Sequence, residues 1–201
     1  QRQMCIRDRL DIVNEYGADA LRTYVLFMGD YGAAAPWNDS SVRGCKRFLE
    51  RVAGLTDIMT EEPAAKDMEV KIHKAIKKVS SDIEAMKFNT AIACLMTLIN
   101  EIYAVGKISK DDLVIFIKLL CPFAPHLCEE IWETIGGEGL LSLSQWPEYE
   151  ESKTVEDSIE IGVQVNGKVR GTIVIPNGCA KEEALELAKK DGGELILVTD
   201  P

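Results

Sequence analysis

Cys121, His126 and Cys128 lie close together in the sequence, and thiolate and imidazole groups are the ligands that zinc prefers. Their spacing matches none of the usual pairs of zinc ligands, and no second cluster could complete a set of four. Free cysteine is also a common core residue. The sequence therefore predicts no metal site here.

A nucleophilic triad is equally unsupported. The two histidines, His73 and His126, stand in a chain without a Gly-x-Ser-x-Gly motif or a catalytic-cysteine context. Many carboxylates are present, but none can be paired across a cleft from the sequence alone. We therefore expect no catalytic residue and no cofactor in this stretch of chain.

Basic side chains form two rows at helical spacing. The first row consists of Arg43, Lys46, Arg47 and Arg51. The second consists of Lys71, Lys74, Lys77 and Lys78. Either row could be the solvated face of an amphipathic helix or a surface for phosphate groups. The net charge of −10 argues against binding nucleic acid by bulk charge, so any such contact must be local.

The composition is that of an ordinary globular protein, with 46% apolar and 28% charged residues in 201. The longest uncharged run, residues 88–100, is shorter than the roughly 20 residues of a membrane-spanning helix. Six cysteines without paired spacing, and no signal peptide, favour a reducing cytoplasm. We expect no contact with a membrane.

Apolar residues at helical spacing predict an antiparallel helical bundle. One face of the second helix would carry Leu21, Tyr24, Val25 and Met28. Expected N-caps are Asn38, Asn89 or Thr90, and Ser109, with Pro125 in the first turn of the last helix. The expected helices span residues 11–17, 18–28, 38–59, 67–86, 91–105, 109–121 and 125–136.

Beyond an acidic linker at residues 148–158 the period of the apolar residues changes from 3.6 to 2, which predicts strands at 159–165 and 169–175. We expect a three-residue loop, Val165 to Gly167, that sets Val163 opposite Val169 and Ile159 opposite Ile173. A helix at 180–190 and a strand at 195–198 would complete a small β-β-α-β unit. A core that small is marginal, so the unit leans on a neighbour or is truncated.

Several motifs, in this order and spacing, resemble the part of leucyl-tRNA synthetase that follows its lysine loop. Isoleucine and valine enzymes share the Gly-Ala-Asp-Ala-Leu-Arg motif, found here at residues 17–22, whereas the Pro-Trp-Asn and Arg-Phe-Leu motifs resemble the leucine branch. The matching segments are Tyr16-Gly-Ala-Asp-Ala-Leu-Arg22, Pro36-Trp-Asn38, Arg47-Phe-Leu49, Lys87-Phe-Asn-Thr-Ala-Ile92, Pro122-Phe-Ala-Pro-His126, Trp146-Pro147 and Val163-Gln-Val-Asn-Gly-Lys-Val-Arg-Gly171. Lys107-Ile-Ser-Lys-Asp111 looks like the lysine loop itself but lies between two predicted helices, in the wrong place.

The resemblance implies a fragment whose catalytic and editing domains lie upstream of residue 10. Its implied parts are a non-native segment 1–9, a connector 10–36, a tRNA-binding bundle 37–147, the linker 148–158 and a partial C-terminal domain 159–201. ATP, magnesium ion and leucine would be bound by the whole enzyme through the upstream domain.

The resemblance also implies tRNA(Leu) as the partner and excludes DNA. Arg43, Lys46, Arg47 and Arg51 would meet backbone phosphates, and Lys168 and Arg170 would meet the tRNA elbow. Two alternatives stay open: the same region of a valyl- or isoleucyl-tRNA synthetase, and a free-standing helical module that binds a protein.

Overall fold

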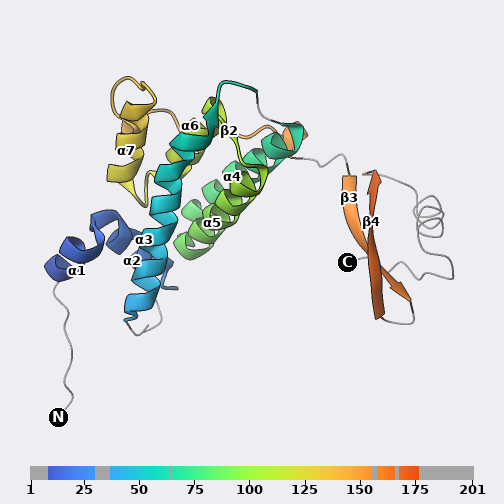
Figure 1. Ribbon diagram of the computed structural model, residues 1–201, viewed down its shortest axis with the longest axis horizontal. Helices are drawn as coiled ribbons and strands as arrows, with labels where there is room; N and C mark the ends of the chain where they lie inside the picture. The colour runs from blue at the N-terminus through green and yellow to red at the C-terminus, as the bar shows by residue number, and fades with distance from the viewer. Residues whose placement is uncertain (1–8, 30–36, 64, 155–157, 166–167, 177–201) are drawn as a thin grey trace, which may run out of the picture. The chain divides into compact units, whose positions relative to one another are not determined.

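The computed structural model describes residues 9–29, 37–63 and 65–154, and the backbone of 158–165 and 168–176 (Figure 1). It divides into two units, residues 1–154 and 155–201. The described part is mainly α-helical, as predicted, and the helices all belong to the first unit. The predicted helix at 180–190 and strand at 195–198 lie outside the described residues.

Two short helices open the first unit, α1 (Arg9–Tyr16) and α2 (Ala18–Phe27). Gly17 separates them with a φ of 94°, a conformation that residues with a β-carbon rarely adopt. The prediction was right about both helices but wrong about one residue of the α2 face. Val25 is 46% exposed, because the buried face of α2 runs through Ala20, Thr23 and Tyr24.

The third helix, α3 (Asp39–Ala53), is capped as predicted by Asn38, whose side chain accepts a hydrogen bond from the Ser40 amide at 2.9 Å. Its end differs from the prediction, since the chain tightens into a 3₁₀ turn, η1 (Gly54–Ile58). Gly54 lies next to Tyr103 of α5 (Phe88–Val105). The Tyr103 hydroxyl donates a hydrogen bond to the Arg51 carbonyl at 2.8 Å. A β-carbon at position 54 would stand 2.8 Å from that hydroxyl oxygen.

Gly54→Ala is therefore expected to lower the free energy of unfolding by about 1–2 kcal/mol, because Tyr103 must move and give up its hydrogen bond. Urea unfolding measures the change. Tyr103→Phe removes the obstructing hydroxyl, so the alanine should cost clearly less in that background. Equal costs in both backgrounds would contradict this explanation.

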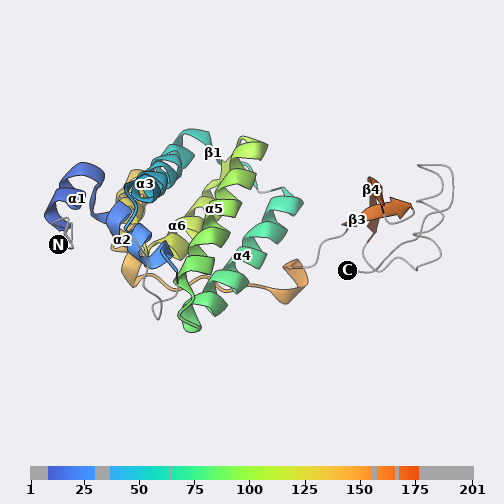
Figure 2. The same cartoon turned by 90° about the horizontal axis from the view of Figure 1, so that it is seen from below.

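Two long helices, α4 (Lys66–Glu84) and α5 (Phe88–Val105), run antiparallel side by side, with α5 inside the bundle and α4 at its edge (Figure 2). The predicted cap of α5 was wrong: neither Asn89 nor Thr90 caps it, and the Thr90 hydroxyl instead donates to the Lys87 carbonyl at 2.9 Å. Gly106 ends α5 in the left-handed conformation, as expected.

Among the described helices, α5 alone is long and apolar enough to span a membrane by length and composition. Its buried face lies in the core of the bundle and contains Ala91, Ile92, Leu95, Leu98, Ile99 and Ile102. These side chains pack against residues of α2, α3, α4 and α6. The apolar character of α5 is thus that of a central core helix.

The last two helices, α6 (Lys110–Leu120) and α7 (Pro125–Thr134), begin at the predicted signals. Ser109 caps α6 by accepting a hydrogen bond from the Asp112 amide at 3.1 Å, and Pro125 occupies the first turn of α7. One feature was not predicted: β1 (Met59–Thr60) pairs in parallel with β2 (Ile108–Ser109). This short pairing joins the break after η1 to the start of α6.

After α7 the chain runs back past α6 to α4 through two 3₁₀ turns, η2 (Leu141–Leu143) and η3 (Glu151–Lys153) (Figure 2). We call residues 141–153 the strap. The Trp146 indole donates to the Ser80 hydroxyl at 2.8 Å, and the Glu150 amide donates to Nδ1 of His73 at 3.1 Å. The acidic segment that the sequence suggested as a linker is therefore bound to α4 up to Lys153.

In the second unit, β3 (Ser158–Val165) and β4 (Lys168–Pro176) form an antiparallel pair. The predicted loop and register were wrong, because Val165 pairs with Lys168 and Ile159 with Ile175. The register shifts by one residue between Val163 and Gln164, which leaves Arg170 of β4 without an opposite residue. This bulge sets Ile161 opposite Ile173 and makes the longer loop unnecessary.

Candidate nucleic-acid interface

Three of the four predicted cations of α3 gather on its outer side. Arg43, Lys46 and Arg47, which we call the α3 basic face, line a shallow hollow of about 500 Å³ together with Tyr16, Ser40 and Glu50. Arg43 and Arg47 are exposed. Within the described part of the chain, none of the three forms an ion pair or a side-chain hydrogen bond. Their positive charges are therefore available to an external anion.

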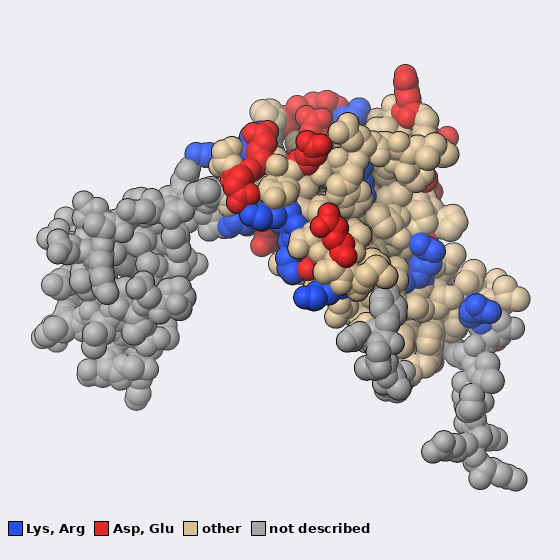
Figure 3. Space-filling model, turned by 180° about the vertical axis from the view of Figure 1, so that it is seen from behind, with Lys and Arg blue, Asp and Glu red and all other residues tan. Residues whose placement is uncertain are grey.

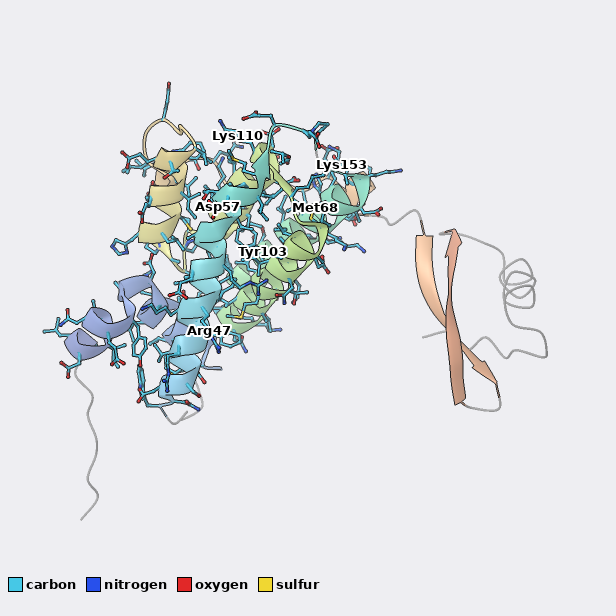
Figure 4. The ribbon with its side chains drawn as sticks, in the orientation of Figure 1. Arg47, Asp57, Met68, Tyr103, Lys110 and Lys153 are labelled. Atoms are coloured by element: carbon cyan, nitrogen blue, oxygen red, sulfur yellow. The ribbon has the colours of Figure 1, made fainter. Side chains whose placement is uncertain are left out.

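Arg51 does not line this hollow, because its side chain is bound to α5. Its guanidinium donates to Oδ1 of Asn100 at 2.7 Å and lies 4.8 Å from the ring centre of Tyr103. Figure 4 labels Arg47 on α3 and Tyr103 on the neighbouring α5. The fourth cation of the row thus joins α3 to α5 and is not part of the α3 basic face.

The lysines of α4 have partners within the chain. Lys77 meets Glu151 of the strap at 2.7 Å, and this hydrogen bond raises the pKa of Lys77. Two further ion pairs join Lys71 to Glu101 at 3.5 Å and Lys78 to Asp82 at 2.7 Å. Lys74 is not free either, since it also takes part in a noncovalent interaction. On the face of the first unit that Figure 3 shows, acidic and basic side chains lie close together. The α4 row is therefore largely neutralised.

The motif at residues 17–22 holds α2 onto the turn between α6 and α7, a role that sequence reasoning missed. The Asp19 carboxylate accepts hydrogen bonds from the Leu127 amide and lies against Nδ1 of His126, both at 2.8 Å, so it caps α7 from another helix. Arg22 donates to the Pro122 carbonyl at 3.0 Å, beyond the end of α6. These bonds thus join the motif at residues 17–22 to the motif at residues 122–126.

Glu129 of α7 plays a similar part for the strap. It accepts hydrogen bonds from the backbone amides of Leu141 at 2.7 Å and Ser142 at 2.9 Å. Burial acts to raise the pKa of Glu129, but these bonds and the Ser142 hydroxyl outweigh it, so the pKa lies below its ordinary value. The ionised carboxylate therefore fixes the first turn of the strap.

Cys121 and Cys128 are buried core residues, and burial is the largest cause of the raised pKa of each thiol. Protonated thiols bind zinc poorly and are weak nucleophiles. His126 is turned toward Asp19. In the part of the chain that the structure describes, no three His, Cys, Asp or Glu side chains are grouped as a metal ion would require.

The segment that looks like a lysine loop has a local structural role. Lys107 pairs with Glu62 at 2.6 Å, and this hydrogen bond lowers the pKa of Glu62. Ser109 is the cap of α6. For Lys168 and Arg170 the structure describes the backbone only, so their side chains lie outside the described residues.

Comparison with known proteins gives the family. The model of the anticodon-binding domain of tRNA ligase matches residues 65–185, and the chain belongs to this family. The Leucine--tRNA ligase of Alkaliphilus oremlandii is 43% identical over 94% of this chain and 24% of that protein, and that of Bdellovibrio bacteriovorus is 44% identical over 89% and 23%. The chain thus spans about a quarter of the length of these curated relatives.

A solved structure has the same fold. It is the ternary complex of Agrobacterium radiobacter K84 agnB2 LeuRS with tRNA and LeuAMS, to which this chain has a TM-score of 0.76 at 32% identity. The match covers 91% of this chain and 26% of that one. The resemblance inferred from the motifs is confirmed by both comparisons.

Proposed function

We propose that this chain is the tRNA-binding part of a leucine--tRNA ligase and that its α3 basic face contacts the sugar-phosphate backbone of tRNA(Leu). The observation that carries the proposal is the contrast between two rows of cations in a chain of net charge −10. The α4 row is neutralised by Glu101, Asp82 and the strap, whereas the α3 basic face has no partner in the described chain. Relatives of this name support the choice of tRNA.

The chemistry of these cations suits positioning of the RNA. Arginine offers several N–H donors in a planar fork that matches phosphate oxygens, and lysine adds a point charge. Such contacts fix the orientation of a nucleic acid without reading its bases. In this proposal the bundle holds the tRNA while leucine, ATP and magnesium ion are handled by other parts of the enzyme. The setting is the cytoplasm.

Lys168 and Arg170 are proposed as further contacts, at the tRNA elbow. Their support is the similarity of residues 163–171 to the start of the C-terminal domain of leucyl-tRNA synthetases. The relatives favour the leucine enzyme over a valine or isoleucine enzyme, since several curated relatives share the name Leucine--tRNA ligase. A free-standing module that binds a protein would leave the α3 basic face without an evident anion.

The test is the binding of a tRNA(Leu) transcript to the full chain at several salt concentrations. Arg43→Gln combined with Arg47→Gln should weaken binding about tenfold near 0.1 M salt and reduce the slope of log K against log salt by about 1.5. Lys71→Gln combined with Lys107→Gln removes the same charge from lysines that already have partners. This control should change binding less than threefold. Equal effects in the two double variants would overturn the proposal.

A further inference from the structure

A second hollow lies on a different side of the first unit, between α2, α6 and the strap. Its volume is about 320 Å³, at the lower end of the range for small-molecule sites. Its lining includes Arg22, Lys118, Pro122, Pro125, Gln145 and Trp146. A hollow of this size accommodates a single compact group.

The hollow is positively charged, since Arg22 and Lys118 line it and no carboxylate does. Each cation is oriented by a neutral backbone oxygen: Arg22 by the Pro122 carbonyl at 3.0 Å and Lys118 by the Gln145 carbonyl at 3.3 Å. A carbonyl leaves the charge uncompensated, and both side chains keep further N–H donors. Neither forms an ion pair within the described residues.

The two carboxylates behind the hollow are already occupied. Both oxygens of Asp19 are held by His126 and the Leu127 amide, and both oxygens of Glu129 by the amides of Leu141 and Ser142. Neither residue lines the hollow. The chain has 33 acidic residues, yet among the described residues the only charged ones that line this hollow are cations. This local excess of positive charge favours an anion.

Part of the remaining lining is apolar, formed by the two prolines and Trp146. Pro122 and Pro125 have fixed backbones, and the indole of Trp146 is held by its hydrogen bond to Ser80 while 38% of the residue remains exposed. Aromatic rings of this kind provide a surface on which a nucleobase can stack. The hollow thus combines donors for a phosphate group with apolar surface for the group attached to it.

We propose that this hollow binds one nucleotide unit, with its phosphate between Arg22 and Lys118 and its nucleoside against the two prolines and Trp146. The inference deepens the proposed function, because it adds to the α3 basic face a contact that would recognise a single exposed nucleotide of the tRNA. The same chemistry could come from a free nucleoside monophosphate, and the experiment separates the two sources.

The first test uses the indole N–H signals of the full chain in ¹H–¹⁵N NMR spectra, with Trp146→Phe to assign the signal of Trp146. Adenosine 5′-monophosphate should shift that signal at millimolar concentration, and adenosine alone should shift it at least threefold less. Lys118→Gln should weaken the nucleotide effect about fivefold, and the control Lys71→Gln should not. Lys118 bonds only to a backbone carbonyl among the described residues, so its replacement should not prevent folding.

The second test adds tRNA(Leu) in place of the free nucleotide. A shift of the Trp146 signal, and a loss of about threefold to fivefold in affinity on Lys118→Gln, would support a nucleotide of the RNA as the occupant. A Trp146 signal that responds to adenosine 5′-monophosphate and not to bound tRNA would overturn that choice in favour of a free nucleotide. A signal that responds to neither ligand would overturn the inference altogether.

The two proposals fail in different ways. If the wild-type chain binds tRNA(Leu) through the α3 basic face and Lys118→Gln has no effect, only the inference about the hollow is wrong. If the wild-type chain does not bind tRNA at all, the proposed function is wrong, and the nucleotide titration still decides whether the hollow is an anion site.

Discussion

Replacing Asp19 with alanine is expected to lower the free energy of unfolding by about 2 kcal/mol. The Asp19 side chain is only 11% exposed. Its Oδ2 accepts a hydrogen bond from the Leu127 amide at 2.8 Å, and its Oδ1 lies 2.8 Å from Nδ1 of His126. Alanine would remove the N-terminal cap of α7 and so leave the part-buried Leu127 amide without an acceptor, a single loss that costs about 2 kcal/mol. Chemical denaturation monitored by circular dichroism measures the loss.

Two matched variants separate the cap from the histidine contact. Asp19→Asn keeps an acceptor for the Leu127 amide and should cost about half as much as alanine. His126→Gln alters a side chain that is 76% exposed and should cost less than about 0.5 kcal/mol. If the histidine variant proved as destabilising as the alanine variant, the capping explanation would be wrong.

The helices could be predicted because their signals are local. Apolar spacing of 3.6 residues placed the helices, and short-range chemistry placed several of their ends, as with Asn38, Ser109, Pro125 and Gly106. One error lies where a distant residue meets the helix. The α-helix of α3 ends at Ala53, where Tyr103 of α5 lies over Gly54 and donates to the Arg51 carbonyl.

The hairpin shows the same limit. The sequence correctly indicated that apolar residues face one another across the strands, but it could not show which register brings them together. A bulge at Arg170 and a longer loop satisfy the same pattern, because each shifts the register by one residue. The parallel pairing of β1 with β2 has no periodic signal at all, since each strand is two residues long.

The candidate site was partly predictable for a related reason. Helical spacing placed Arg43, Lys46 and Arg47 on one side of α3, but it could not reveal that Arg51 bonds to Asn100. It also could not show that acidic residues of the strap reach Lys77 of α4. The two basic rows look alike in the sequence, and they differ in whether partners from elsewhere in the chain neutralise them.

The distribution of ion-pair partners also suits the proposed local binding of RNA by an acidic protein. Exposed ion pairs add little stability, so the pairs of α4 matter chiefly because they remove positive charge from that helix. A polyanion approaching the first unit would then be attracted mainly to cations that form no ion pair, and among the described residues these include the α3 basic face and the hollow at Arg22 and Lys118. Internal ion pairing would therefore restrict the sites open to the proposed RNA partner.

The family motifs identified the protein class without revealing their roles. Within Gly17–Arg22, Asp19 and Arg22 hold the end of α6 and the start of α7, so their importance for α2 is structural. Glu129 does the same for the strap. Such contacts join segments that are 100 or more residues apart, or that meet only after a turn, and a single sequence contains no signal for them.

Gly137→Ala is the second change with a large expected effect, a loss of about 3 kcal/mol in the free energy of unfolding. A β-carbon at position 137 would overlap the indole ring of Trp132, whose backbone carbonyl accepts a hydrogen bond from the Gly137 amide at 2.8 Å. The ring packs against the core and its Nε1 is buried, so it has little room to move.

A double-mutant cycle tests whether this overlap is the cause. Trp132→Leu alone should cost about 2 kcal/mol through lost packing, but it removes the ring atoms that the new β-carbon would meet. Gly137→Ala should then cost less than about 1 kcal/mol in the leucine background, so the two changes together should cost clearly less than their sum. Additive costs would show that position 137 needs glycine for its backbone conformation. That result would be unexpected, because Gly137 is not among the glycines with positive φ, whereas its neighbour Gly136 has a φ of 83°.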